Sequence, residues 1–194
     1  ARLEKKVFEC FPEAYRPKSL ADAYAVQGRF LDIMGWAVEG WFCACTNKKI
    51  QEILRYDKPF YARRFADLVF ASPAALKVSE FPPIALECEF GFRLKHDLPK
   101  RGEAYSQADV EAAIATLHPT IDVVAPYLEN WTEQDVFSVI ADNGADGAVV
   151  YGEGVADWRT LDLVNMKITL TVGGKPARQG TGANVLGDPM AALV

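Results

Sequence analysis

The clearest strand in the sequence lies in P-I-A-L-E-C-E-F-G-F-R-L-K-H-D-L-P, residues Pro83–Pro99. Apolar and other side chains alternate strictly from residue 84 to residue 94, which is the pattern of a β-strand with two different faces. One face carries the apolar residues Ile84, Leu86, Cys88, Phe90, Phe92 and Leu94. The other face carries Glu87, Glu89, Gly91 and Arg93. The segment therefore predicts a strand that presents two carboxylates side by side.

Glu87 and Glu89 are two residues apart, so their side chains start about 7 Å apart and can converge on one ion. Beside a protein core the two carboxylates would repel each other unless a cation or hydrogen bonds compensated them. A divalent metal would supply that compensation. The spacing alone leaves a second interpretation open, in which both glutamates are ordinary residues on a solvent-facing strand edge.

Three S/T-x-x-D patterns, which are typical of helix N-termini, begin at Ser19, Ser106 and Thr132. Apolar residues at helical spacing follow each pattern, as far as residues 33, 117 and 140 respectively. A further helix is predicted over 47–55. These patterns indicate at least four helices.

Short apolar runs predict strands over 36–45, 65–70, 120–124 and 148–151, and a hairpin over 166–179 turns at Gly173 and Gly174. Helices dominate the first part of the chain and strands the second, so we expect an α+β fold. We find no internal repeat or linker. The expected organisation is a single domain, 1–194, with a helix-rich N-terminal part (1–75) and a β-rich metal-binding core (76–194).

The composition fits a globular protein: half of the 194 residues are hydrophobic and 24% are charged. The formal net charge is −5 and the basic residues are scattered, which argues against a nucleic-acid partner. No apolar run approaches the ~20 residues of a membrane-spanning helix, and the start of the sequence lacks the apolar stretch of a secretory signal. We therefore expect a cytoplasmic protein without a membrane partner.

The last residues form an abrupt end. Asp188 and Pro189 are a good N-cap and first-turn pair, but only Met190–Val194 follow them. A single helical turn is not stable by itself. We expect the natural protein to continue, and the strands that would complete its sheet to be missing here.

The segment Pro83–Pro99 resembles the E-x-E metal-binding segment, preceded by proline and ending in D-L-P, of the fumarylacetoacetate hydrolase superfamily. Four more stretches resemble the same family in the same order: A-Y-A-V-Q at Ala23–Gln27, H-P-T-I-D-V-V at His118–Val124, A-D-N-G at Ala141–Gly144, and G-T-G-A-N-V-L-G-D-P at Gly180–Pro189. The branch that these motifs resemble contains 2-keto-4-pentenoate hydratases and 4-oxalocrotonate decarboxylases of aromatic-compound catabolism.

The resemblance implies a metal site made by Glu87, Glu89 and Asp122, where the branch more often has glutamate in place of Asp122. Hard carboxylate oxygens favour Mg²⁺ or Mn²⁺ over zinc. The implied activity is a lyase of the hydratase type, which acts on a short unsaturated 2-oxo acid through a metal-stabilised enolate or dienolate. A 2-oxo-acid decarboxylase and an acylpyruvate-type C–C hydrolase of the same superfamily are alternatives. The implied fold has a curved mixed β core of the family's C-terminal-domain type, and relatives form homo-oligomers.

One departure from the family concerns a lysine. Relatives carry G-W-K where this chain has Gly40, Trp41 and Phe42, so the catalytic group at this position is unknown. Lys48 or Lys49 could replace the lost amine, although such a pair at a helix start is commonly a solvated face.

Two further departures remove polar groups. Tyr127 stands where an arginine is frequent, and Gly144 and Ala145 stand where relatives commonly offer a serine. From the family we carry over weak substrate-binding roles for Gly180, Thr181 and Asn143. The losses also suit a different class of function, a catalytically silent metal-binding subunit that partners an active relative.

Overall fold

The computed structural model describes all residues, 1–194, and has a mixed α+β architecture, as the sequence predicted. The helices are α1 (Leu20–Met34), α2 (Lys48–Leu54), α3 (Gln107–Ala113) and α4 (Val136–Ala141). The strands are β1 (Val38–Ala44), β2 (Phe60–Phe65), β3 (Val69–Ala71), β4 (Ala85–Leu94), β5 (Ile114–Val124), β6 (Ala148–Tyr151), β7 (Lys167–Val172) and β8 (Lys175–Thr181). They form two two-stranded sheets, β1-β2 and β7-β8, and a four-stranded sheet in the order β3-β6-β5-β4.

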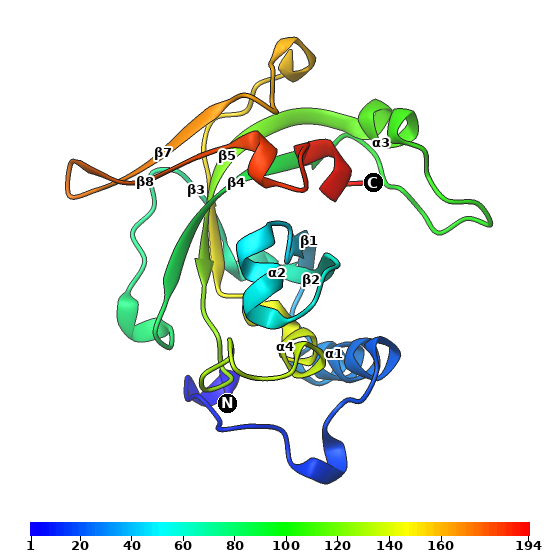
Figure 1. Cartoon of the computed structure of the whole chain (residues 1–194), viewed down its shortest axis with the longest axis vertical. Helices are drawn as coiled ribbons and strands as arrows, with labels where there is room; N and C mark the ends of the chain where they lie inside the picture. Colours follow the sequence, from blue (N-terminus) through cyan, green and yellow to red (C-terminus); the bar gives the residue numbers. More distant parts are fainter. The chain divides into compact units, whose positions relative to one another are not determined.

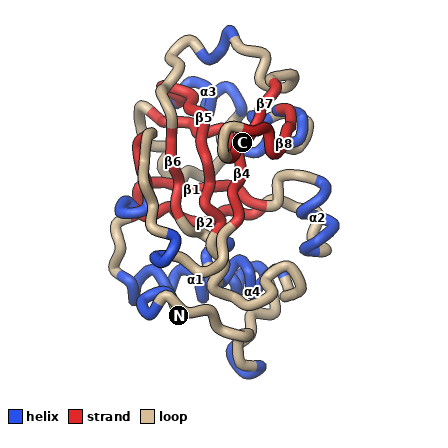
Figure 2. The backbone as a smooth tube through the Cα atoms, turned by 90° about the vertical axis from the view of Figure 1, so that its left-hand side faces the viewer, coloured by secondary structure: helices blue, strands red, loops and turns tan.

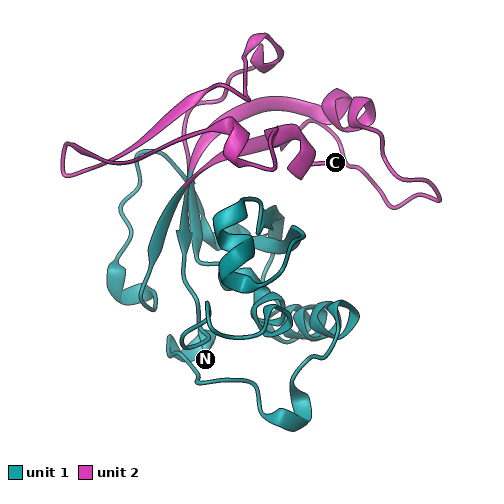
Figure 3. Ribbon diagram, in the orientation of Figure 1, with its two compact units in different colours: residues 1–87, 121–150 teal, residues 88–120, 151–194 magenta.

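The chain divides into two compact units, which Figure 3 shows in different colours. The first unit comprises residues 1–87 and 121–150, and the second comprises 88–120 and 151–194. Strands β4 and β5 each contribute residues to both units.

Helices α1 and α4 lie side by side in the first unit (Figure 1). The Ser19 hydroxyl accepts a hydrogen bond from the Asp22 N–H at the start of α1, and Gly35 ends the helix at a positive φ of 63°. The buried Gln27 side chain donates to the Ile140 carbonyl over 2.9 Å, which joins α1 to α4. The apolar core around these helices contains Ala23, Cys45, Leu54, Phe60, Leu128, Val136, Val139 and Ile140.

Strands β1 and β2 run antiparallel beside each other (Figure 2), with Phe42 opposite Ala62 and Gly40 opposite Arg64. Phe60, Ala62 and Arg64 alternate on the buried face of β2. Helix α2 connects the two strands and begins at the Asn47 cap.

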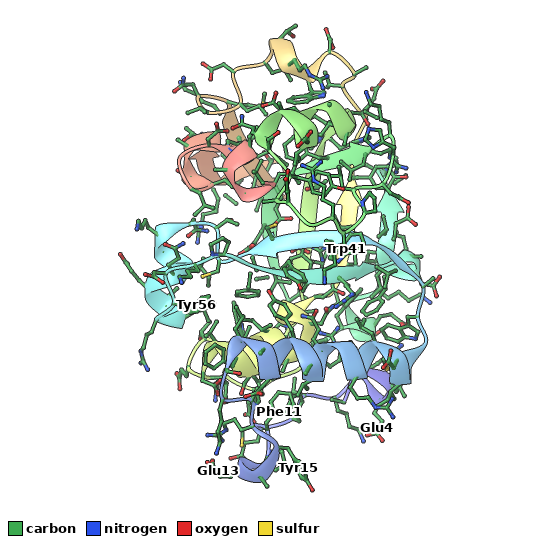
Figure 4. The ribbon with its side chains drawn as sticks, turned by 90° about the vertical axis from the view of Figure 1, so that its right-hand side faces the viewer. Glu4, Phe11, Glu13, Tyr15, Trp41 and Tyr56 are labelled. Carbon is green, nitrogen blue, oxygen red and sulfur yellow. The ribbon has the colours of Figure 1, made fainter.

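Tyr56, which follows α2 (Figure 4), packs edge-on against Phe137 of α4, with the ring centroids 6.5 Å apart. This contact joins the segment between β1 and β2 to α4, and both rings pack against the apolar core of the first unit.

The second unit has its own apolar core, formed by Ile114, Leu117, Trp158, Leu163 and Met190. Its β7-β8 hairpin turns at Gly173 and Gly174, both with positive φ, as predicted. The loop after β8 needs glycine at residue 182, because an added Cβ would lie 1.7 Å from the Leu163 carbonyl oxygen.

Most predicted elements are present, and three details were wrong. The apolar run 65–70 is not one strand: it contains the end of β2, a 3-10 turn (Ala66–Leu68) and the start of β3. The helix after Ser106 ends at Ala113, since the residues from Ile114 onward belong to β5. The N-cap of α4 is Asp135 and not Thr132, because the Asp135 carboxylate accepts from the Ser138 N–H. No helix combines the length and the apolar character that crossing a membrane requires.

Candidate metal centre

Three acidic side chains meet at neighbouring positions of β4 and β5. Oxygen atoms of Glu87 and Glu89, on β4, and of Asp122, on β5, all lie within 4.8 Å of one another. Glu87 is exposed, Glu89 is half-buried and Asp122 is buried. The structure therefore brings together the three residues that the family resemblance singled out.

The two oxygens of Asp122 have different surroundings. Oδ2 lies 2.7 Å from Nη2 of Arg64, in an ion pair whose side chains are 6% and 5% exposed. Oδ1 is buried and has no hydrogen-bond partner. A buried carboxylate oxygen without a partner is costly, and a cation would satisfy it. The donor set and this unpartnered oxygen fit a hard divalent ion such as Mg²⁺.

The electrostatics of Glu87 also reflect the crowding of negative charge. Although Glu87 is an exposed residue, partial burial of its carboxyl group raises the pKa, and the negative charge of Asp122 raises this pKa further. The positive charge of Arg64 acts in the opposite direction. A bound cation would remove this repulsion and favour the ionised form of Glu87.

Arg64 and Asp146 are two charged residues near the cluster that the sequence analysis missed. Nη1 of Arg64 lies 2.6 Å from Oδ1 of Asp146, whose side chain is fully buried. Burial raises the pKa of Asp146 to about 6, while Arg64 and Arg2 oppose this rise. The alternation of Phe60, Ala62 and Arg64 would have marked Arg64 as a buried cation, had β2 been recognised as a strand.

Phe42 lies directly beside Arg64: the guanidinium carbon is 4.1 Å from the centroid of the Phe42 ring. Lys48 and Lys49 are exposed in the first turn of α2, as the interpretation of a solvated face predicts. The Phe42 ring also limits the space at Gly144. A Cβ added there would lie 3.1 Å from this ring and 3.1 Å from the Phe60 ring.

The residues with predicted substrate-binding roles lie in both units. The Asn143 side chain is fully buried, accepts a hydrogen bond from the Arg63 N–H and donates one to the Arg63 carbonyl. Both ends of this amide are thus engaged with the backbone of β2. Gly180 and Thr181 end β8 in the second unit and are half-buried.

Comparison with known proteins gives a consistent set of relatives, although no protein-family model matches the sequence. The chain is 28% identical over 186 residues to 2-keto-4-pentenoate hydratase from Paraburkholderia xenovorans (strain LB400). The aligned region covers 94% of this chain and 68% of the relative. The chain is also 26% identical over 193 residues to 4-oxalocrotonate decarboxylase from Pseudomonas putida, covering 97% and 70% of the two chains.

Among solved structures, 4-oxalocrotonate decarboxylase from Pseudomonas putida G7, complexed with magnesium and adipate, matches with a TM-score of 0.87 at 24% identity. The match covers 100% of this chain and 74% of that one. The same enzyme complexed with calcium and acetate matches with a TM-score of 0.85. The fold is therefore that of a 4-oxalocrotonate decarboxylase.

The sequence similarities confirm the resemblance drawn from the motifs. The chain is a relative of the 2-keto-4-pentenoate hydratases and the 4-oxalocrotonate decarboxylases.

Proposed function

We propose that this protein is a Mg²⁺-dependent lyase of the hydratase type, acting on a short unsaturated 2-oxo acid, with Glu87, Glu89 and Asp122 as the metal ligands. Mn²⁺ is the expected substitute ion. The observation that carries the proposal is the convergence of these three carboxylates, with one buried Asp122 oxygen lacking any hydrogen-bond partner. The similarity to hydratases and decarboxylases supplies the type of reaction.

The three carboxylates have a defined task in this function. They hold the ion and leave about three of magnesium's six positions for the substrate and water. When bound, Mg²⁺ supplies Lewis-acid polarisation of the substrate's 2-oxo group. Arg64 holds Oδ2 of Asp122 and leaves Oδ1 of that residue for the ion.

The aromatic ring of Phe42 limits what the neighbouring part of the site can do. A phenyl ring neither donates a proton nor pairs with a carboxylate, so proton transfer must come from another group or from water. The ring lies close to Gly144, and the family resemblance implies polar side chains at both places. This difference favours a substrate with a more apolar tail.

A 2-oxo-acid decarboxylase and an acylpyruvate-type C–C hydrolase are the alternatives within the same chemistry, because both would use the same polarised 2-oxo group. The substitution of Phe42 for the family lysine favours a second kind of function, a catalytically silent metal-binding subunit that associates with an active relative. Measurable turnover by the purified protein alone would remove this second candidate.

Several finer expectations belong to the same proposal. The resemblance implies a β core of the fumarylacetoacetate hydrolase C-terminal-domain type and a homo-oligomer, to which we add a single domain and a cytoplasmic location. It also implies weak substrate contacts from Gly180, Thr181 and Asn143. Size-exclusion chromatography with light scattering tests the oligomer, and a monomer at micromolar concentration would contradict it.

Isothermal titration calorimetry with Mg²⁺ tests the proposed metal site. We expect the wild-type protein to bind Mg²⁺, and E87Q/E89Q to lose this binding. Glu80→Gln is a matched control, since Glu80 pairs with Lys5 in an exposed ion pair and is not part of the cluster. Equal Mg²⁺ affinity in the wild type and E87Q/E89Q would exclude the proposed site. Turnover assays with 2-oxopent-4-enoate, 4-oxalocrotonate and an acylpyruvate then separate the three reactions.

A further inference from the structure

Arg64 is held by two carboxylates and an aromatic ring in the buried part of the first unit. Its Nη1 lies 2.6 Å from Asp146, its Nη2 lies 2.7 Å from Asp122, and its guanidinium carbon lies 4.1 Å from the Phe42 ring centroid. The Arg64 side chain is only 6% exposed. A guanidinium stays charged in proteins, so this position carries a permanent positive charge.

Strand β2 places this cation directly on the Phe42 ring of the neighbouring strand β1. A second arginine has similar surroundings: the Arg2 guanidinium carbon lies 4.7 Å from the Tyr127 ring centroid. In both places an arginine from another element packs on an aromatic ring.

Arg64 differs from Arg2 in the carboxylate that it neutralises. Nε of Arg2 lies 3.5 Å from the carboxylate oxygen Oδ1 of Asp142, whereas Arg64 pairs with Asp122, a proposed metal ligand. A cation bound at Oδ1 of Asp122 would therefore share one carboxylate with the guanidinium at Oδ2. Two positive charges on one carboxylate repel each other, so each weakens the binding of the other.

We propose that Arg64 is a built-in counter-ion of the carboxylate cluster, which neutralises Asp122 and Asp146 in the metal-free protein and lowers the affinity of the cluster for a divalent cation. The inference rests on the proposed metal site and goes beyond it, because it assigns to this chain a positioning residue outside the set of metal ligands. It predicts an exchangeable ion and a fold that does not depend on it.

The test is Mg²⁺ calorimetry at pH 8 on EDTA-treated, desalted protein. Arg64→Met should bind Mg²⁺ roughly tenfold more tightly than the wild type. The guanidinium and the bound ion would be separated only by the Asp122 carboxylate, and even at the dielectric constant of water the repulsion between these charges weakens binding by about this factor. Arg64→Lys keeps the charge and should stay within about threefold of the wild type. Arg2→Met is the matched control, a buried arginine stacked on an aromatic ring that forms its ion pair with Asp142 and not with a proposed metal ligand, and it should change the affinity much less than Arg64→Met does.

The change in Mg²⁺ affinity caused by Asp146→Asn distinguishes a counter-ion from a structural residue. The substitution removes a negative charge and leaves Arg64 to Asp122 alone, so Mg²⁺ should bind several-fold more weakly than in the wild type. A purely structural role of the Arg64–Asp146 pair predicts weaker binding for both variants, whereas the proposal predicts opposite directions.

Thermal unfolding provides a second readout. Saturating Mg²⁺ should raise the unfolding temperature of Arg64→Met more than that of the wild type, since the ion replaces the lost positive charge. If Arg64→Met does not fold without the ion, the double variant R64M/D146N, which removes the whole charge pair, should bind Mg²⁺ more tightly than D146N.

The outcomes distinguish this inference from the proposed function. A wild-type protein that does not bind Mg²⁺, or binds it independently of Glu87, contradicts the metal site itself. Two other outcomes overturn only the role of Arg64, provided that Mg²⁺ binding requires Glu87. In the first, Arg64→Met binds Mg²⁺ no more tightly than the wild type. In the second, R64M/D146N binds Mg²⁺ no more tightly than D146N.

Discussion

The buried Asp146 carboxyl group gives the metal-free protein a pH dependence of stability that one substitution should remove. Burial raises its pKa from the ordinary 3.8 to about 6, against the attraction of Arg64 and Arg2. At pH 7.5 the group is ionised in both the folded and the unfolded state. As the pH falls through 6, the folded state takes up a proton before the unfolded state does, so the free energy of unfolding rises.

The difference between 3.8 and about 6 corresponds to about 3 kcal/mol once the pH lies below both values, and roughly half of this gain is reached at pH 5. The raised pKa values of Glu87 and Asp142 act with the same sign. An asparagine side chain cannot ionise, so Asp146→Asn should lose an increase in stability on the order of 1 kcal/mol between pH 7.5 and pH 5.

Urea denaturation in EDTA, followed by circular dichroism at several pH values between 5 and 7.5, measures this effect. Asp109 does not titrate in this range, because its pKa is lowered to about 2, chiefly by hydrogen bonds from Ser106 and Arg101. Parallel pH profiles for the wild type and Asp146→Asn would refute the reasoning. A wild-type protein that loses stability from pH 7.5 to pH 5 would refute it as well.

Three further predictions concern packing and charge in the first unit. Gly144→Ser should lower the free energy of unfolding by about 2–3 kcal/mol in urea denaturation, because the residue has φ +65° and an added Cβ would lie 3.1 Å from the Phe42 ring. A change below about 0.5 kcal/mol would contradict both the backbone strain and the crowding. Phe42→Lys should destabilise the protein by about 2 kcal/mol or more, because it buries an amine beside Arg64, and the double variant F42K/R64M should lose less; equal losses would argue against a charge conflict. Ile140→Ala, in α4, should cost about 2–5 kcal/mol in the same assay, since Ile140 is fully buried against α1, and a loss below about 1 kcal/mol would contradict the packing of the two helices.

The elements that the sequence predicted well are those with strong local signals. The Ser19 cap and Gly35 define both ends of α1, and the Gly173–Gly174 pair defines the β7-β8 turn. The predicted strand around Glu87 and Glu89 is β4, since alternation over ten residues is hard to produce otherwise.

The elements that were missed depend on contacts between distant parts of the chain. Ile114 continues the helical spacing of α3 but belongs to β5, because pairing within the four-stranded sheet overrides the local helical pattern. Arg64 and Asp146 are 82 residues apart, and no local pattern connects them. The three carboxylates could be named only from the family resemblance, since alternation identifies a strand face but not the residue of another strand that approaches it.

A crystal structure of the protein soaked in Mn²⁺, with anomalous diffraction data, tests the proposed metal centre most directly. We predict one strong anomalous peak within about 2.0–2.4 Å of an oxygen from each of Glu87, Glu89 and Asp122, with Oδ1 as the Asp122 ligand and Arg64 still at Oδ2. A peak elsewhere, or no peak while the three carboxylates face separate regions of solvent, would contradict the account.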